Sequence, residues 1–203
     1  MIAQFQNGAI VSVSATKKCG STSLHRMIFD ALNDSWSVSF RKGDWIKDSR
    51  YFNYKSRFLK KYSQSDITAS CAVLRDPVSR MKSIYKHSVV SHKRTPFRNT
   101  EPPSWNEFLE NFYKIRQQHT NVRVHSEPQV NSIGSTSQYN KIIVLDKLNE
   151  EFPAWLNHLA NTNIKAVHKK KTGSRSISVT DEQESLIREY FQEDYSAYSQ
   201  YFD

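Results

Sequence analysis

A short segment between an expected strand and an expected helix carries side chains suited to binding an anion. Residues 16–24 read Thr-Lys-Lys-Cys-Gly-Ser-Thr-Ser-Leu, so two lysines precede a glycine and three hydroxyl residues follow it. A loop at the start of a helix directs backbone N–H groups and the positive end of the helix dipole at one point. Gly20 permits close approach of the backbone, and Lys18 adds a full charge. The segment predicts a phosphate or sulfate site; the plainer alternative is that Ser21 or Thr22 only caps the helix.

A second junction places an arginine directly after an apolar run. Residues 69–74, Ala-Ser-Cys-Ala-Val-Leu, are typical of a buried parallel strand, and Arg75-Asp76-Pro77 follows them. Asp76 is suited to the N-cap of a helix and Pro77 to its first turn. Arg75 is therefore expected at the carboxyl edge of a parallel sheet, where open α/β sheets bind ligands. An isolated Arg-Asp-Pro is also a common strand-to-helix junction.

Together the two segments resemble the cofactor signatures of the sulfotransferases. Residues 18–23 are similar to the 5′-phosphosulfate loop of that family, usually Pro-Lys-Thr-Gly-Ser-Thr-Ser. Residues 75–85 are similar to its 3′-phosphate motif, Arg-Asp-Pro followed by Arg, Ser and Tyr. The most similar branch is the carbohydrate type, the chondroitin and heparan sulfotransferases and their bacterial relatives. Lys17 stands where the family has proline, and Cys19 where it has threonine.

The resemblance implies 3′-phosphoadenosine 5′-phosphosulfate as the sulfuryl donor and no metal ion. The residues that it assigns to this co-substrate are Lys18, Cys19, Gly20, Ser21, Thr22 and Ser23 for the 5′-phosphosulfate, Arg75 and Ser83 for the 3′-phosphate, and Lys171, Gly173 and Ser174 in a late basic loop. An exposed charged turn is the plainer interpretation of that loop. In-line sulfuryl transfer depends on positioning and charge stabilisation, and Lys18 would neutralise the leaving oxygen.

The acceptor must lose a proton, and His125 is the predicted base. The ordinary pKa of histidine lies near neutrality, which suits this role. Residues 125–129, His-Ser-Glu-Pro-Gln, are also similar to a His-x-x-Pro-Gln segment of the same branch. Isolated histidines are more often structural, and His25, Asp44 and Glu127 remain alternative bases.

The elements around these motifs alternate between strand and helix, which predicts an α/β fold: a single P-loop-like domain over residues 1–203, with a central parallel sheet flanked by helices. The expected strands are 9–14, 36–40, 69–74 and 142–146. The expected helices are 24–32, 148–159, one from Ser104 with a capping box to Glu107, and one from Thr180 with Leu186, Ile187, Tyr190, Phe191, Tyr195 and Tyr198 on one face.

Composition is that of a folded globule of one domain. The 203 residues are 37% hydrophobic and 12% aromatic, without repeats or low-complexity tracts. The two cysteines, Cys19 and Cys71, do not indicate a disulfide framework, so a reducing, cytoplasmic location is expected. The sequence contains neither a secretory signal nor a membrane-spanning run. Because Golgi members of the family carry an amino-terminal anchor, the resemblance implies a compact bacterial or phage enzyme, or else a truncated chain.

The net charge of +9 predicts an anionic ligand or partner, although a basic surface can also serve solubility. Cations and aromatic rings alternate through residues 41–62, and residues 88–103 form a polar loop. Both segments could line an acceptor site, and a carbohydrate hydroxyl is the acceptor that the resemblance implies. A solvated helix with an aromatic core face explains residues 41–62 equally well. The oligomeric state cannot be derived from the sequence.

Two other classes of function stay open. A P-loop kinase would share the strand-loop-helix start, but a Walker A motif places its lysine after the second glycine, whereas here both lysines precede Gly20. A non-enzymatic nucleic-acid binder would use residues 41–62 for stacking and phosphate contacts. It would leave the paired motifs unexplained, so no nucleic-acid partner is expected.

Overall fold

The computed structural model describes residues 1–32, 63–90, 97, 100–166 and 177–202. The strands are β1 (Ile2–Gln4), β2 (Ile10–Ala15), β3 (Ala69–Leu74) and β4 (Lys141–Val144). The α-helices are α1 (Ser21–Leu32), α4 (Pro77–Tyr85), α5 (Trp105–Glu110), α6 (Phe112–Gln118), α7 (Thr120–His125), α8 (Val130–Ile133), α9 (Leu148–Ala160), α10 (Asp181–Tyr190) and α11 (Gln192–Tyr198). Short helical turns are η1 (Gln64–Asp66), η2 (Lys86–Val90, a π-helix), η3 (Thr136–Gln138), η4 (Leu145–Lys147) and η5 (Ser199–Tyr201).

Several predictions made from the sequence lie outside the described residues. They are the strand at 36–40, the basic aromatic stretch at 41–62 with Asp44, part of the loop at 88–103, and the late loop with Lys171, Gly173 and Ser174.

The chain groups into two compact units, each assembled from three stretches of sequence. The first, here called the sheet unit, contains Met1–Ser14, Gly20–Val73 and Thr136–Lys170. The second, here called the helical unit, contains Ala15–Cys19, Leu74–Ser135 and Lys171–Asp203. That residues 1–203 act as one domain stays a prediction.

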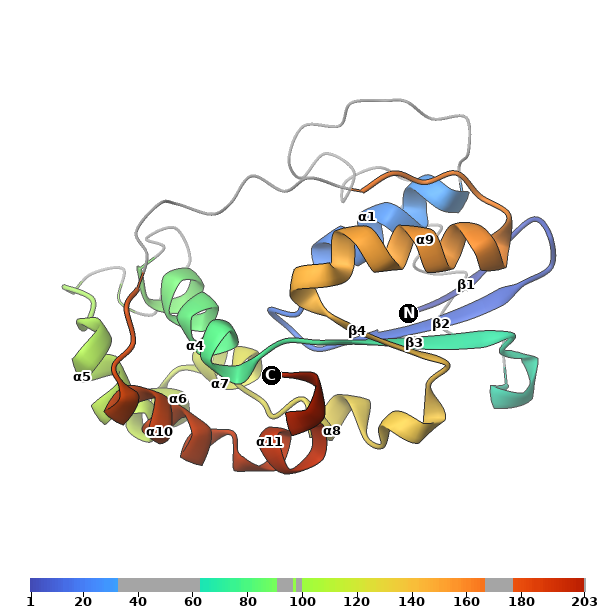
Figure 1. Ribbon diagram of the computed structural model, residues 1–203. Coiled ribbons are helices and arrows are strands. Elements are labelled where there is room, and N and C mark those ends of the chain that lie inside the picture. The colour runs from blue at the N-terminus through green and yellow to red at the C-terminus, as the bar shows by residue number, and fades with distance from the viewer. Residues whose placement is uncertain (33–62, 91–96, 98–99, 167–176, 203) are drawn as a thin grey trace. The chain divides into compact units, whose positions relative to one another are not determined.

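The sheet unit is an α/β structure, as the alternating pattern predicts. Its four strands lie in the order β1-β2-β3-β4, and the sheet is mixed but mostly parallel. The antiparallel pair is β1 with β2, in the register Ile2 to Ser12 and Gln4 to Ile10. Helices α1 and α9 lie side by side over one face of the sheet (Figure 1). The short apolar run of β3 is buried at all six positions, which explains why it shows no polar alternation.

Helical spacing of apolar residues produces the layer that covers the sheet. Helix α1 buries Leu24, Met27 and Ile28, and α9 buries Leu148 and Phe152, each at intervals of three or four residues. These side chains remove apolar surface from water, which is the main favourable contribution to the stability of the unit.

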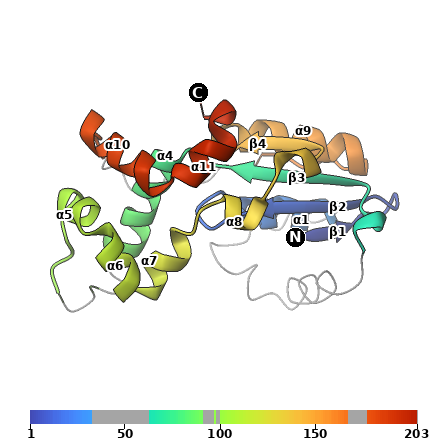
Figure 2. The same cartoon turned by 90° about the horizontal axis from the view of Figure 1, so that it is seen from below.

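The helical unit packs α10 against α4 and α5, and α6 against α7 (Figure 2). Its core contains buried side chains from α4, η2, α5, α6, α7 and α10 and from the residue that follows α10: Met81, Ile84, Val89, Phe108, Leu109, Phe112, Ile115, Val122, Ile187 and Phe191. The predicted caps are confirmed. Asp76 accepts a hydrogen bond from the Ser79 N–H at 2.7 Å, and Pro77 occupies the first turn of α4. Capping boxes begin α5, from Ser104 to Glu107, and α10, from Thr180 to Gln183.

Two predicted boundaries are wrong. The strand expected at 142–146 ends at Val144, because Leu145 already begins the helical turn that leads into α9. The helix expected to run from Thr180 past Tyr198 breaks at Phe191, whose N–H is shared between the carbonyl groups of Ile187 and Glu189. An apolar periodicity continues through such a break, so it cannot locate it. In the described part of the chain, every helix is too short or too polar to cross a membrane.

Candidate functional site

The loop that the sequence marks as an anion site makes a tight, constrained turn. Within it, the Cys19 N–H donates to the Thr16 carbonyl at 3.2 Å, and the Thr16 hydroxyl lies 2.9 Å from the Cys19 sulfur. Lys18 has a φ of +70°, which non-glycine residues rarely adopt. Thr16 and Cys19 are buried, whereas Lys17 is exposed and Lys18 half-buried. The turn therefore directs the small side chains inward and leaves the lysines at the surface.

Arg75 connects this loop to the second predicted motif. Its Nη1 donates a hydrogen bond of 2.8 Å to the Lys18 carbonyl, 57 positions away in the sequence. Both residues belong to the helical unit. Two segments that the sequence marks separately as phosphate-binding therefore lie next to each other.

The buried side chain of Gln129 binds both the loop, at Cys19, and the second motif, at Arg75. Its Oε1 accepts from the Arg75 N–H at 2.9 Å and from the Cys19 thiol at 3.1 Å. Its Nε2 donates to the Arg75 carbonyl at 2.9 Å and to Asp194 Oδ2 at 3.3 Å. These four bonds use the whole hydrogen-bonding capacity of the side-chain amide. Burial raises the pKa of the Cys19 thiol, although the nearby Arg80 opposes this, so the thiol stays neutral and can donate. With its side chain committed inward, Cys19 can offer a ligand only its backbone.

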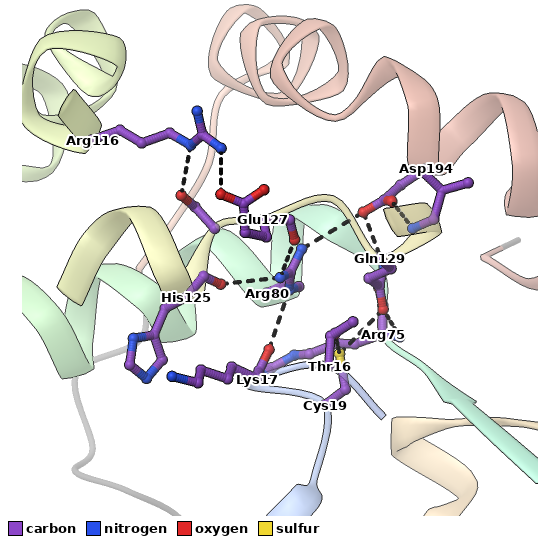
Figure 3. A network of polar contacts seen from close by, with 12 residues as sticks. Thr16, Lys17, Cys19, Arg75, Arg80, Arg116, His125, Glu127, Gln129 and Asp194 are labelled. Atoms are coloured by element: carbon purple, nitrogen blue, oxygen red, sulfur yellow. Dashed lines mark hydrogen bonds and ion pairs between the residues drawn. The ribbon is translucent and has the colours of Figure 1, made fainter. Parts of the chain in front are cut away.

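Arg80 lies at the centre of the network in Figure 3 and is completely buried. Its guanidinium donates to the backbone carbonyl groups of Lys17, His125 and Glu127, and its Nη1 lies 3.7 Å from Asp194 Oδ2. Burial lowers the pKa of Arg80 and raises that of Asp194, and the mutual attraction of the two charges opposes both shifts. The network joins the turn at Lys17, the end of α7 and helix α11.

His125, the predicted base, is the last residue of α7 and is half-buried. Its Nδ1 lies 2.7 Å from the Asn121 carbonyl, so Nδ1 carries the proton in the neutral ring and Nε2 can accept one. Burial lowers the pKa of His125, and the positive charges of Lys17, Lys18 and Arg80 lower it further, although the bond to Asn121 acts in the opposite direction. Figure 3 shows the Lys17 side chain running toward the imidazole. A neutral imidazole beside a cationic loop suits a proton acceptor.

The lowered pKa of His125 predicts a pH-dependent stability. Because the folded-state pKa lies below the unfolded value, the neutral imidazole contributes stability that is complete above about pH 6.5 and is lost as the pH falls through the folded-state pKa. We expect the free energy of unfolding of the wild type to fall between pH 7.5 and pH 5 by more than that of His125→Asn, whose amide can still donate to Asn121. Urea unfolding at several pH values measures this difference. Parallel pH dependence of the two proteins would contradict it.

Two of the three alternative bases, His25 and Glu127, lie among the described residues. Glu127 Oε1 forms an ion pair of 2.9 Å with Arg116 Nη2, which neutralises its charge. His25 lies on α1 of the sheet unit. Ser83, predicted to bind a phosphate, is half-buried on α4 and accepts a backbone hydrogen bond from Lys86. The Glu127 carbonyl accepts a hydrogen bond from Arg80, so this residue adjoins the network around Arg80.

Gly20 lies directly before α1 in the sheet unit, and its carbonyl accepts from the N–H groups of Ser23 and Leu24 at 2.8 and 3.0 Å. Ser21 and Thr22 are half-exposed and exposed, whereas Ser23 is buried. The φ of Gly20 is +76°, and a Cβ there would lie 2.6 Å from Leu145 Cδ1 and 2.7 Å from Leu148 Cδ2. A glycine at this position therefore serves both the turn and the packing of α9.

We expect Gly20→Ala to lower the free energy of unfolding by roughly 2–4 kcal/mol, as the sum of left-handed strain and overpacking. Gly8→Ala is the matched control, since Gly8 has a φ of +87° but no atom within 4 Å of the added Cβ. The control should lose only the strain, about 1–2 kcal/mol. Equal losses in urea unfolding would show that Leu145 and Leu148 move aside without cost.

Comparison with protein-family models and with curated proteins finds no match to this chain. The described residues contain no group of three or more His, Cys, Asp or Glu side chains arranged to hold a metal ion. Sequence reasoning assigned no individual role to Arg80, Gln129 or Asp194. Arg80 and Gln129 occur within the motifs that carry the resemblance, and Asp194 within the late helix, and this is the only signal by which the sequence marks them.

Proposed function

We propose that this protein is a sulfotransferase that moves a sulfuryl group from 3′-phosphoadenosine 5′-phosphosulfate to a carbohydrate hydroxyl. The observation that carries the proposal is the hydrogen bond from Arg75 Nη1 to the Lys18 carbonyl, because it joins the two segments that resemble the cofactor motifs. The order along the chain supports the same proposal, since strand β2, a short loop and helix α1 follow one another as a P-loop-like domain requires.

The charges of the helical unit agree with an anionic co-substrate. Lys17 and Lys18 lie in the loop and Arg75 beside it, and the positive potential of both lysines already lowers the pKa of His125. In the proposal, Lys18 binds the 5′-phosphosulfate, and Arg75 binds the 3′-phosphate with Ser83. A planar guanidinium such as that of Arg75 is the donor group best suited to a phosphate.

The chemistry requires one proton acceptor and one cation. The donor supplies the sulfuryl group, whose bond to the 5′-phosphate breaks as its bond to the acceptor oxygen forms. His125 Nε2 takes the proton of the acceptor hydroxyl, and Lys18 balances the charge that develops on the phosphate oxygen. The hydrogen bond between His125 Nδ1 and Asn121 keeps the imidazole in the tautomer that this role needs.

Calorimetric titration with 3′-phosphoadenosine 5′-phosphate, the desulfated product, tests the proposal. We expect binding that prefers this nucleotide over ATP with magnesium and that is lost in Arg75→Met. Arg116→Met is the matched control, since Arg116 is an arginine of the same unit that binds Glu127 rather than the loop. Absence of binding to the wild type, or a preference for ATP with magnesium, would overturn the proposal.

A further inference from the structure

One buried side chain, that of Arg80, binds both the turn at Lys17 and the segment that carries His125. From α4, Arg80 Nε donates to the Lys17 carbonyl at 3.4 Å, and Nη2 donates to the carbonyl groups of His125 and Glu127 at 3.0 and 2.5 Å. Lys17 and the predicted base, His125, are therefore bound to the same rigid, planar guanidinium. A change in the position of the guanidinium would move both segments.

Asp194 holds the guanidinium and the chain beyond His125. Both its side chain and that of Arg80 are inaccessible to solvent, and Asp194 Oδ2 lies 3.7 Å from Arg80 Nη1. Asp194 Oδ1 also accepts from the Val130 N–H at 3.0 Å, and Oδ2 accepts from Gln129 Nε2 at 3.3 Å. Through Asp194, helix α11 thus holds residues 129–130 directly (Figure 3). It also holds the Arg80 guanidinium, which binds the carbonyl groups of residues 125 and 127.

This arrangement is a costly way to stabilise a fold. Removing two charges from water is expensive, and well-packed apolar side chains often replace a buried ion pair without loss of stability. Among the described residues, Arg80 Nη1 has no hydrogen-bond acceptor, so the desolvation of the guanidinium is compensated there by the charge of Asp194 and by the Phe191 ring, whose centroid lies 5.5 Å from Arg80 Cζ. What a guanidinium provides, and an apolar side chain cannot, is a planar set of donors that reaches three carbonyl groups in fixed directions.

We propose that Arg80 is a positioning residue for sulfuryl transfer, which sets the Lys17–Lys18 turn and His125 at one mutual geometry while Asp194 holds its guanidinium in place. The inference rests on the proposed function. Transfer reactions are sensitive to such placement, because a displacement of about 1 Å far from the reacting atoms can reduce the rate roughly 10²-fold.

The test uses Arg80→Lys, which keeps the charge but loses the planar donor set, and compares it with Arg116→Lys. Arg116 also binds the same segment, through Ser126 Oγ at 3.2 Å and the Glu127 carboxylate, but from the surface. Two quantities are measured on folded protein: the dissociation constant of 3′-phosphoadenosine 5′-phosphate by calorimetry, and the pKa of His125 by NMR without nucleotide.

We expect Arg80→Lys to weaken nucleotide binding by about 10-fold or more, since the loop loses its fixed turn. We also expect it to raise the pKa of His125, since the ring leaves its partly buried position even though the cation is retained. Arg116→Lys should change neither quantity. If Arg80→Lys lowers only the thermal stability, with both quantities as in the wild type, Arg80 is merely structural and the inference is overturned.

If Arg80→Lys does not fold, Asp194→Asn replaces it, because the amide oxygen keeps the bond to the Val130 N–H, while the charge that holds Arg80 and the bond from Gln129 Nε2 are lost. We then expect weaker nucleotide binding and a raised pKa of His125, both changes being smaller than in Arg80→Lys. Absence of both changes would overturn the inference. If the wild type itself does not bind the nucleotide, the proposed function fails, and the pKa of His125 in the variants still decides whether Arg80 positions this segment.

Discussion

Asp194→Ala is expected to lower the free energy of unfolding by about 3–5 kcal/mol, because it leaves Arg80 as a buried charge without a counter-ion. Both side chains are completely buried, and Asp194 also accepts hydrogen bonds from Val130 and Gln129. The substitution therefore removes a charge, two hydrogen-bond acceptors and packed volume at one place. Urea unfolding near pH 7.5 measures the loss.

Glu184→Ala is the control for Asp194→Ala. Glu184 forms an ion pair with Arg188 at 2.8 Å on α10, but the two side chains are 42% and 55% exposed. Water screens such a pair, so its loss should cost no more than about 1 kcal/mol. Similar losses in the two variants would mean that Arg80 does not depend on Asp194 for its charge balance.

Lys18→Met is expected to reduce the turnover number for sulfuryl transfer by about 10²–10³-fold, the loss seen when one preorganised donor to a developing oxyanion is removed. Methionine is unbranched and only one atom shorter than lysine, and it leaves the backbone strain at a φ of +70° unchanged, so the variant changes mainly the charge. The interaction should act most strongly in the transition state, and the Michaelis constant for the donor should rise much less. Transfer of labelled sulfate to a panel of carbohydrate acceptors measures both constants.

Lys17→Met tests whether Lys18 acts through its own position or only through the positive charge of the loop. Lys17 adjoins Lys18 and its charge also lowers the pKa of His125, but its side chain is exposed and runs toward the imidazole. Its removal should alter the pH dependence of transfer more than the maximal rate. Equal losses of turnover in the two variants would assign the effect to the net charge of the loop. A rise in the Michaelis constant alone in Lys18→Met would mean that Lys18 binds ground state and transition state equally.

Local physical rules were sufficient for most elements of the fold. The caps at Asp76, Ser104 and Thr180 follow from side chains that bond to backbone groups three residues away, and the periodicities of α1 and α9 follow from contact with one sheet face. The same rules failed at Val144 and Phe191, where the element ends but the apolar pattern continues. Boundaries without a cap signal depend on what the chain packs against.

The sequence by itself determined most of the described strands and helices and the helix caps, and it marked two segments as candidates for anion binding, because each of these depends on residues within a few positions of one another. Only the tertiary structure decided that Gln129 binds Cys19 across 110 positions, that it binds Asp194 across 65, and that Arg80 holds the carbonyl groups of Lys17 and His125. The partner of a buried polar group is set by where distant segments cross, and no spacing along the chain encodes that crossing. The sequence thus predicted the cations of the candidate site, whereas the buried residues that hold them, Arg80, Gln129 and Asp194, were found only in the fold.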